Sequence, residues 1–248
     1  MLKNIDIGNV LFLDIECVSG QASYEDLSDD LKALWHIKAR SVLKRYGEDI
    51  SVEDQANTYK DRAAIYAEFG KIVCISVGVI TRDKQDKKLN IRLKSFANED
   101  EAQLLKDFSA MLDQYYSPAK HFICGHNIKE FDVPYMCRRM VVNQLPFPRM
   151  LEVQGKKPWE TKHLLDTMEL WSFGDRKAFT SLKLLAATFG FPSPKDDIDG
   201  SEVGRVFWEE KDLQRIATYC EKDVLATAQL LLKYKLMPLL NEDQITIV

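Results

Sequence analysis

Hydrophobic positions near the start of the chain follow the patterns of β-strands on both sides of one helical stretch. Residues 9–16 form a short apolar run that breaks at Asp14, which is typical of a buried strand whose end reaches a polar site. Residues 71–80 are rich in β-branched side chains, and residues 89–96 alternate apolar with polar after a charged turn. The last two segments predict a β-hairpin.

Residues 19–68 have a different pattern, because their apolar side chains recur mostly at three-, four- and seven-residue spacings. These side chains are Leu27, Leu31, Leu34, Trp35, Val42, Leu43 and Tyr46. Such spacing is typical of amphipathic helices. We therefore expect a half-exposed helical insertion after the first strand. Three roles are open for these helices: they gate a site, bind a partner or only add bulk. The pattern of apolar residues does not rank these three roles.

Helices dominate the rest of the chain. Asn98 is a candidate cap for a helix through about Tyr116, residues 121–127 resemble a further strand, and a helix begins near Asp132. Residues 144–160 contain three prolines and a glycine, which indicates an exposed connection.

Three further helical patterns follow at residues 162–172, 180–189 and 209–236, and Gly190 ends the second. Strands followed by helices favour an α/β protein with a mixed central sheet, folded as one domain over residues 1–248.

Composition narrows the class of protein. The 248 residues are 46% hydrophobic and 29% charged, with a formal net charge of −4, so a general attraction for polyanions is absent and any contact with nucleic acid must be local. The five cysteines are scattered without a C-x-x-C pair, which predicts reduced thiols. No apolar run approaches the roughly 20 residues that span a bilayer, and the N-terminus lacks a signal-peptide pattern. We expect a cytoplasmic protein without membrane association.

Asp14 and Glu16 are two residues apart at a strand end, so their carboxylates point to the same side. Adjacent like charges raise a pKa unless a cation lies between them. The pair is therefore either solvated at the strand end or a site for a hard metal ion.

Two other segments carry candidate chemistry. Residues 125–132 form a strand end and a loop that presents Asn127 and Phe131 before Asp132, at the start of a helix. In the alternative without a functional role, Asp132 only caps this helix and Phe131 only packs in the core. In the late helical pattern Tyr219 and Asp223 are four residues apart and share one face. A helix-surface aspartate beside a core tyrosine gives the same spacing.

Taken together and in this order, the three segments resemble the exonuclease motifs of the DEDDy 3′→5′ exonucleases. This ribonuclease H-like group includes the proofreading domain of family B DNA polymerases. The phrases are Leu13-Asp-Ile-Glu16, His126-Asn-Ile-Lys-Glu-Phe-Asp132 and Tyr219-Cys-Glu-Lys-Asp223. They are similar to stand-alone bacterial exonucleases, and the resemblance extends from about residue 10 to 234. It implies a ribonuclease H-like sheet flanked by helices.

The resemblance also implies a role for each motif residue. Asp14 would bridge two divalent ions, Mg²⁺ or Mn²⁺, and Glu16 and Asp223 would complete the ligands of the first ion. Asp132 would hold the second ion, partly through water. Tyr219 would orient the attacking water, because a phenol is a poor base at neutral pH. In the related group with a catalytic histidine, that histidine stands where this chain has Thr218.

Outside the motif carboxylates and Tyr219, other residues have weaker assignments. By resemblance, Asn127, Phe131 and the backbone near Ile15 and Cys17 would hold the last nucleotides of the substrate. His126 is expected to be structural, and Asp166 to begin a helix or support the site indirectly. Short basic clusters such as Arg138-Arg139 could contact phosphates, although runs this short are usually solvated surface.

These observations predict an enzyme, a metal-dependent 3′→5′ exonuclease that releases nucleoside 5′-monophosphates from single-stranded DNA ends. An exoribonuclease with the same carboxylates is the enzymatic alternative. A non-catalytic nucleic-acid or protein-binding module is the alternative from another class, and the four clustered acids disfavour it because they would repel phosphate. The expected partner is a single strand, with DNA favoured over RNA by the resemblance alone. The sequence does not specify a protein partner.

Overall fold

In the computed structural model, which describes residues 2–85, 87–175, 179–192 and 197–248, six strands form one sheet in the order β5-β4-β1-β2-β3-β6. The strands are β1 (Val10–Ser19), β2 (Gly70–Arg82), β3 (Leu89–Ala97), β4 (Phe122–Gly125), β5 (Leu164–Asp166) and β6 (Ile245–Ile247). β2 is antiparallel to β1 and β3, whereas β4 is parallel to β1 and β5, and β6 is parallel to β3. The predicted mixed sheet is confirmed.

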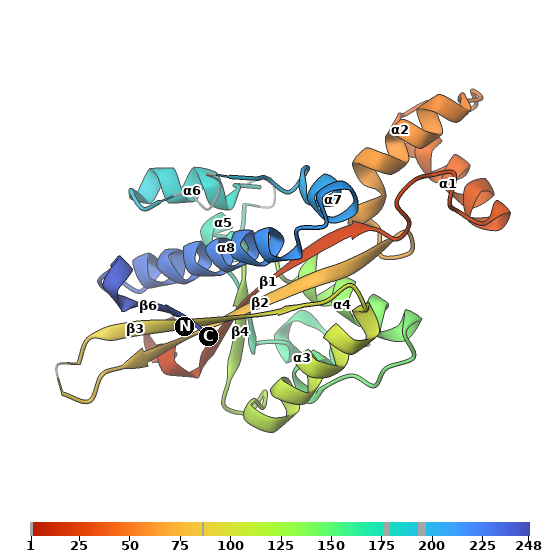
Figure 1. Cartoon of the computed structure of the whole chain (residues 1–248). Helices are drawn as coiled ribbons and strands as arrows, with labels where there is room; N and C mark the ends of the chain where they lie inside the picture. Colours follow the sequence, from red (N-terminus) through yellow and green to blue (C-terminus); the bar gives the residue numbers. More distant parts are fainter. Residues whose placement is uncertain (1, 86, 176–178, 193–196) are drawn as a thin grey trace.

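Helices cover both faces of this sheet (Figure 1). α3 and α4 lie on one face, and α8 crosses the other, with α5, α6 and α7 beside it. The helices are α1 (Asp29–Val42), α2 (Val52–Arg62), α3 (Glu101–Tyr115), α4 (Asp132–Val142), α5 (Thr167–Ser172), α6 (Leu182–Phe189), α7 (Val203–Arg205) and α8 (Leu213–Tyr234). No helix in the described parts of the chain is long and apolar enough to cross a membrane.

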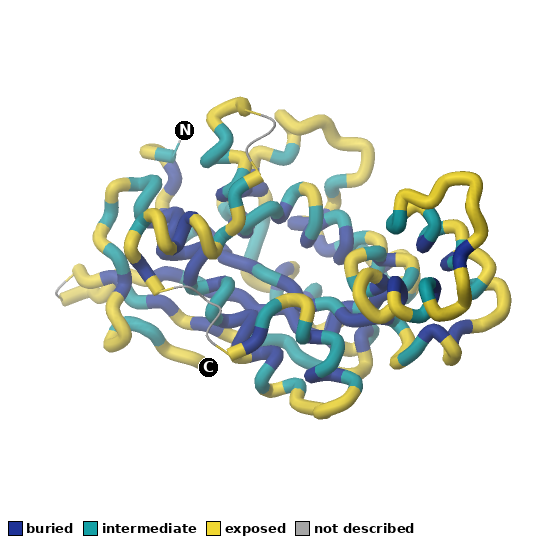
Figure 2. The backbone as a smooth tube through the Cα atoms, turned by 90° about the horizontal axis from the view of Figure 1, so that it is seen from above, coloured by how far each residue is buried: buried dark blue, intermediate teal, exposed yellow. Residues whose placement is uncertain are grey.

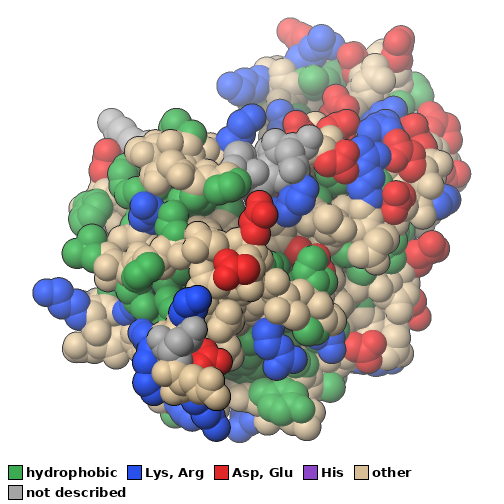
Figure 3. All heavy atoms as spheres, turned by 60° about the vertical axis from the view of Figure 1, so that its left-hand side comes forward, with side chains coloured by type: hydrophobic (Ala, Val, Ile, Leu, Met, Phe, Trp, Pro, Cys, Tyr) green, Lys and Arg blue, Asp and Glu red, His purple; other side chains and the backbone are tan. Residues whose placement is uncertain are grey.

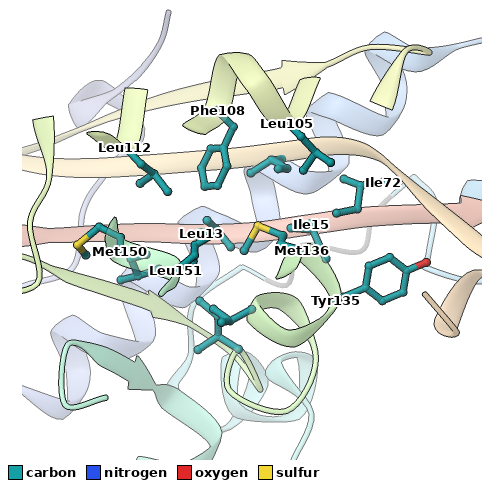
Figure 4. Close-up of a cluster of buried hydrophobic side chains, with 14 of the residues drawn as sticks. Leu13, Ile15, Ile72, Leu105, Phe108, Leu112, Tyr135, Met136, Met150 and Leu151 are labelled. Carbon is teal, nitrogen blue, oxygen red and sulfur yellow. The ribbon is translucent and has the colours of Figure 1, made fainter. Parts of the chain in front are cut away.

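The alternation of β1 supplies core to both layers. Leu13 and Ile15 point toward α3 and α4, where Phe108 and Met136 pack against the same cluster (Figure 4). Phe12 points to the opposite face and packs with α8. Asp14 follows Phe12 by two residues on that second face, so the sequence that builds the core also directs a carboxylate toward α8.

Residues 20–69, which connect β1 to β2, form a helical arm at one end of the sheet. α1 and α2 pack around Trp35, whose side chain is completely buried and donates from Nε1 to the carbonyl oxygen of Gln55 at 3.0 Å. The Trp35 ring meets Tyr59 edge to face, with centroids 5.2 Å apart. Figure 2 shows the arm on the right, mostly exposed, while the strands in the middle are buried. The arm therefore has a small core of its own.

Some element boundaries differ from the sequence expectation. The cap of α3 is Asp100, which accepts from the amide of Gln103, while Asn98 instead accepts from the amide of Asp100. In the 144–160 connection Met150 and Leu151 are fully buried in the main core, so this segment is exposed only in part.

Two of the helical patterns also divide into two separate elements. The pattern at 162–172 divides into β5 and α5, because Leu164 and Leu165 extend the sheet beside β4. The last pattern begins as a π-helical turn, Val206–Glu210, and Lys211 then adopts a left-handed backbone with φ of 57°. This residue separates the turn from α8.

Candidate active site

The first two candidate carboxylates lie where β1 loses a neighbouring strand. β4 pairs with β1 only from Val10 to Phe12, and then ends at Gly125. β1 itself continues to Ser19. Asp14 and Glu16 lie in this second half of β1, which pairs with no described strand on the β4 side. The backbone groups along this open edge can therefore contact other elements.

Asp132 comes from the helix that follows β4. It is the first residue of α4 and is only 3% exposed. Its carboxylate accepts hydrogen bonds from its own backbone amide and from the amide of Ile15 on β1. α4 is thereby joined at its start to the open edge of β1, beside the first two carboxylates.

Tyr219 and Asp223 come from α8 on the opposite side. They are one helical turn apart, and the Tyr219 hydroxyl donates to the Asp223 carboxylate. Cys220 lies between them in sequence and fixes the helix against β1, since its sulfur lies 3.4 Å from the carbonyl oxygen of Asp14 and 3.6 Å from Oδ2 of the same residue. One ligand atom from each of Asp14, Glu16 and Cys220 lies within 4.8 Å of the other two.

The electrostatics show that all four carboxylates share one neighbourhood. Burial raises the pKa of Asp14 well above its ordinary value, and the charges of Asp223, Asp132 and Glu16 raise it further. Burial also raises the pKa of Asp132 to about 7, with the charge of nearby Asp166 adding to the effect. Like charges held this close in a partly dry site repel one another. A divalent cation with oxygen ligands would relieve that repulsion.

Tyr219 is protonated at neutral pH in this environment. It is 6% exposed, and burial, followed by the charges of Asp223, Glu16 and Asp14, raises the pKa of its hydroxyl above the ordinary value. A phenol in this state donates a hydrogen bond rather than accepting a proton. Its position among the carboxylates suits an orienting group.

The loop between β4 and α4 is held in place by Asp166 at the end of β5. The Asp166 carboxylate accepts from the backbone amides of Asn127 and Lys129, at 3.0 and 3.1 Å, and also caps α5 through the amide of Met168 at 2.9 Å. The helix-start role expected for Asp166 is therefore observed. His126 is structural as expected, since its ring nitrogens lie 2.9 Å from Thr167 Oγ1 and from the Thr180 carbonyl oxygen.

Asn127 is unusual among the residues of this loop. Its backbone is left-handed with φ of 65°, and its side-chain oxygen is buried with no hydrogen-bond partner in the described part of the chain. An unsatisfied buried polar group costs about 1–3 kcal/mol. Asn127 also lines a cavity of about 610 Å³, together with Asp166 and Phe179. That cavity adjoins the loop between β4 and α4. The candidate carboxylates on β1 and α8 are not among its lining residues, so the cavity lies beside the candidate site and does not contain it.

The other expected substrate contacts are distributed around the same edge. Phe131 is half buried against the main core, with its ring centroid 5.4 Å from that of Tyr135. The Ile15 side chain is core, so only its backbone faces the site. Cys17 is half buried, and burial raises the pKa of its thiol well above the ordinary value.

Sequence reasoning did not anticipate two features around the site. Cys220 contacts Asp14, and no sequence pattern indicates which face of α8 would meet β1. Arg139, in one of the short basic clusters, is not available to phosphate because it forms an ion pair with Glu101, with Nη2 and Oε2 2.6 Å apart. Glu101 also accepts from the amide of Ile72, so this pair ties α3 and α4 to β2.

Comparisons with known proteins agree with this architecture. Residues 65–244 match the model of a family described as a predicted 3′-5′ exonuclease related to the exonuclease domain of PolB. The match contains Asp132, Tyr219 and Asp223, whereas Asp14 and Glu16 precede it. No curated protein matches the chain.

A solved structure gives a similar result. The family B DNA polymerase from the hyperthermophilic archaeon Pyrobaculum calidifontis superposes with a TM-score of 0.53 at 17% sequence identity. The alignment covers 92% of this chain and 24% of the polymerase chain, so this chain spans about a quarter of that protein. At this level of identity the similarity shows a shared fold.

Proposed function

The chain belongs to the family of predicted 3′-5′ exonucleases related to the exonuclease domain of PolB, and from this premise we propose that it is a metal-dependent 3′→5′ exonuclease acting on single-stranded DNA ends. The products are nucleoside 5′-monophosphates. The observation that carries the proposal is the crowding of the carboxylates Asp14, Glu16, Asp132 and Asp223. Burial raises the pKa of Asp14, and repulsion from the other three raises it further. A protein gains nothing in stability from such crowding, but a phosphodiesterase needs it to bind cations.

Oxygen donors of this kind suit Mg²⁺ or Mn²⁺, and four carboxylates in one neighbourhood offer oxygen ligands for two such ions. When bound, two ions supply charge stabilisation to the entering and leaving oxygens of an in-line displacement at phosphorus. Asp14 would bridge them, with Glu16 and Asp223 as further ligands of the first. Asp132 would hold the second, partly through water. The nearby Cys220 thiol is a softer ligand, which these hard ions do not prefer.

Tyr219 would orient the attacking water in this scheme. Its hydroxyl donates its single proton to Asp223, so its oxygen can accept a hydrogen bond from the water and fix the water's direction without removing its proton. Fixing the nucleophile in line with the scissile bond is worth a large factor in rate. An orienting tyrosine at this position would assign the protein to the DEDDy group.

The substrate would be a strand with a free 3′ end. The net charge is −4, and the face shown in Figure 3 carries acidic side chains among the basic ones, so this face does not offer a uniformly basic surface to a duplex. The loop residues Asn127 and Phe131 would contact the terminal nucleotide. The unpartnered side-chain oxygen of Asn127 supports this role because a ligand would satisfy it.

One assay tests the proposal against its rivals. Matched 5′-labelled DNA and RNA strands are incubated with Mg²⁺ or Mn²⁺, with and without chelator. We expect the DNA strand to shorten stepwise from its 3′ end only when metal is present, with mononucleotides as the product. Faster shortening of RNA would identify an exoribonuclease, and intact strands of both kinds under all conditions would indicate a binding module.

A further inference from the structure

A pair of lysines lies beyond the carboxylates, at the end of β1 where the arm begins. Lys71 is directly across from Val18 in the β1–β2 ladder, on the face that packs against the π-helical turn and α8. Lys211 directly follows the π-helical turn, Val206–Glu210, in the chain. Figure 1 shows α7, which leads into this turn, above the tip of β1 and next to the arm.

Two aromatic rings of the π-helical turn lie close to both ammonium groups. Lys71 Nζ is 4.8 Å from the centroid of Trp208, and Lys211 Nζ is 5.1 Å from the same point. The ring of Phe207 also lies near both, at 4.7 and 5.9 Å. The two nitrogens are therefore less than about 10 Å apart, a span that flexible lysine side chains can close around one phosphate group.

The charges of Glu101 and Glu99 act on Lys71 from beyond ion-pair distance, and the charge of Lys211 acts against them. Among the described residues, neither ammonium has a carboxylate within 4.0 Å. Glu209 forms an ion pair with Lys60 of the arm at 3.6 Å. Glu210 forms ion pairs with Arg205 and Arg215. Two adjacent cations without a close ion-pair partner attract an anion, and aromatic rings beside them can stack on bases.

The pair is also connected to the first candidate motif through Trp208 and the end of β1. Trp208 donates from Nε1 to Oγ of Ser19 at 3.0 Å, and Ser19 is the last residue of β1, three beyond Glu16. Tyr219 belongs to the same hydrophobic cluster as Trp208. A strand whose 3′ end reaches the carboxylates can therefore pass along this corner.

We propose that Lys71 and Lys211 bind a backbone phosphate of the substrate strand on the 5′ side of the scissile bond, with Trp208 offering its half-exposed ring to a base. This inference rests on the proposed function, because it assigns the path of the same strand. The net charge of the chain is −4, so the pair would provide the local attraction that the molecule as a whole lacks.

The test measures binding separately from cleavage. Affinity of a 5′-labelled single-stranded oligothymidylate is determined by anisotropy in chelator, over a range of salt concentrations, for the wild type and for the Lys71→Gln/Lys211→Gln variant. We expect affinity to fall roughly tenfold, and the slope of log affinity against log salt to become shallower by about 0.7 for each phosphate that the variant no longer neutralises. The control is Lys94→Gln/Lys106→Gln, which removes two exposed lysines, one of them over the ring of Phe96.

The readouts keep this inference distinct from the proposed function. With metal present, the lysine variant should raise KM while kcat stays near the wild-type value. Quenching of tryptophan fluorescence by the oligonucleotide should diminish in Trp208→Phe. Equal affinity and equal salt slope for wild type and lysine variant would overturn the inference even if the enzyme digests DNA. If the double variant is unstable, Lys211→Gln alone decides the question, because that side chain is exposed.

Discussion

The carboxylate of Asp132 accepts a hydrogen bond from the backbone amide of Ile15, and this contact joins the start of α4 to the open edge of β1. It exists because β4 ends early and leaves that edge without a strand partner. The same contact places the second motif beside Asp14 and Glu16 of the first.

Replacing one carboxylate should separate activity from stability. We expect Asp14→Asn to lower nuclease turnover by at least about a thousandfold, because the variant lacks the ligand shared by both proposed ions. The melting temperature of the metal-free variant should equal or exceed that of the wild type, since repulsion at the site decreases. Activity is measured on a labelled single strand and melting by calorimetry in chelator.

A surface variant provides the control for Asp14→Asn. Asp243→Asn makes the same chemical change on an exposed residue at the other end of the chain and should leave both quantities unchanged. Near-wild-type turnover by Asp14→Asn would contradict the metal-ligand assignment.

Metal binding should stabilise the folded protein by linkage. At a Mg²⁺ or Mn²⁺ concentration one hundred times the dissociation constant, the free energy of unfolding should rise by about 2.7 kcal/mol. Thermal melts with and without metal measure this change. The Asp14→Asn/Asp223→Asn variant should show little or no shift, and a shift as large as that of the wild type would place the ions elsewhere.

The stability of the metal-free protein should depend on pH through the same carboxylates. Burial raises the pKa of Asp132 to about 7, and the pKa of Asp14 is also raised, so the folded protein binds protons that the unfolded chain has already released. The free energy of unfolding should therefore fall as pH rises from about 4 to about 7. Denaturant titrations in chelator measure this, and the fall should be smaller in Asp132→Asn. A wild type and a variant with the same pH profile would contradict the raised pKa.

Some of the site was predictable because its geometry is local. Asp14 and Glu16 share a side of β1 because they are two residues apart, and Tyr219 and Asp223 share a face because they are four apart on a helix. The mixed sheet also followed from strand patterns and the resemblance. These features need no knowledge of how distant segments pack.

Other features depend on tertiary packing and were not accessible from the sequence. The contact of Cys220 with Asp14 depends on the rotation of α8 over the sheet. β5 was hidden within a helical spacing, because Leu164 and Leu165 are apolar neighbours in either structure. Asp100 displaces Asn98 as the cap of α3, a difference of two residues that local preferences do not resolve because both side chains are good caps.

Removing the Tyr219 hydroxyl should slow the enzyme without removing its metal. We expect Tyr219→Phe to lower kcat roughly ten- to a thousandfold, because the attacking water loses its orienting hydrogen bond. The melting shift produced by Mn²⁺ should persist. Tyr115→Phe, on the exposed side of α3, is the matched control and should retain full activity. Full activity of Tyr219→Phe would make Tyr219 a packing residue and remove the DEDDy label, while leaving the carboxylate assignment intact.

Substrate form should distinguish end-directed cleavage of a single strand from other nuclease activities. The terminal phosphodiester must reach largely buried carboxylates beside the open edge of β1, and a paired end reaches them only after fraying. Single strands and 3′ mismatches should therefore be digested faster than blunt duplexes. A 3′-phosphate should inhibit, because it adds negative charge where the terminal hydroxyl would bind. Labelled substrates that differ only at the 3′ end measure these rates, with a circular single strand as the control that offers no end. Cleavage of the circle, or equal rates on blunt and single-stranded ends, would contradict exonuclease action at this site.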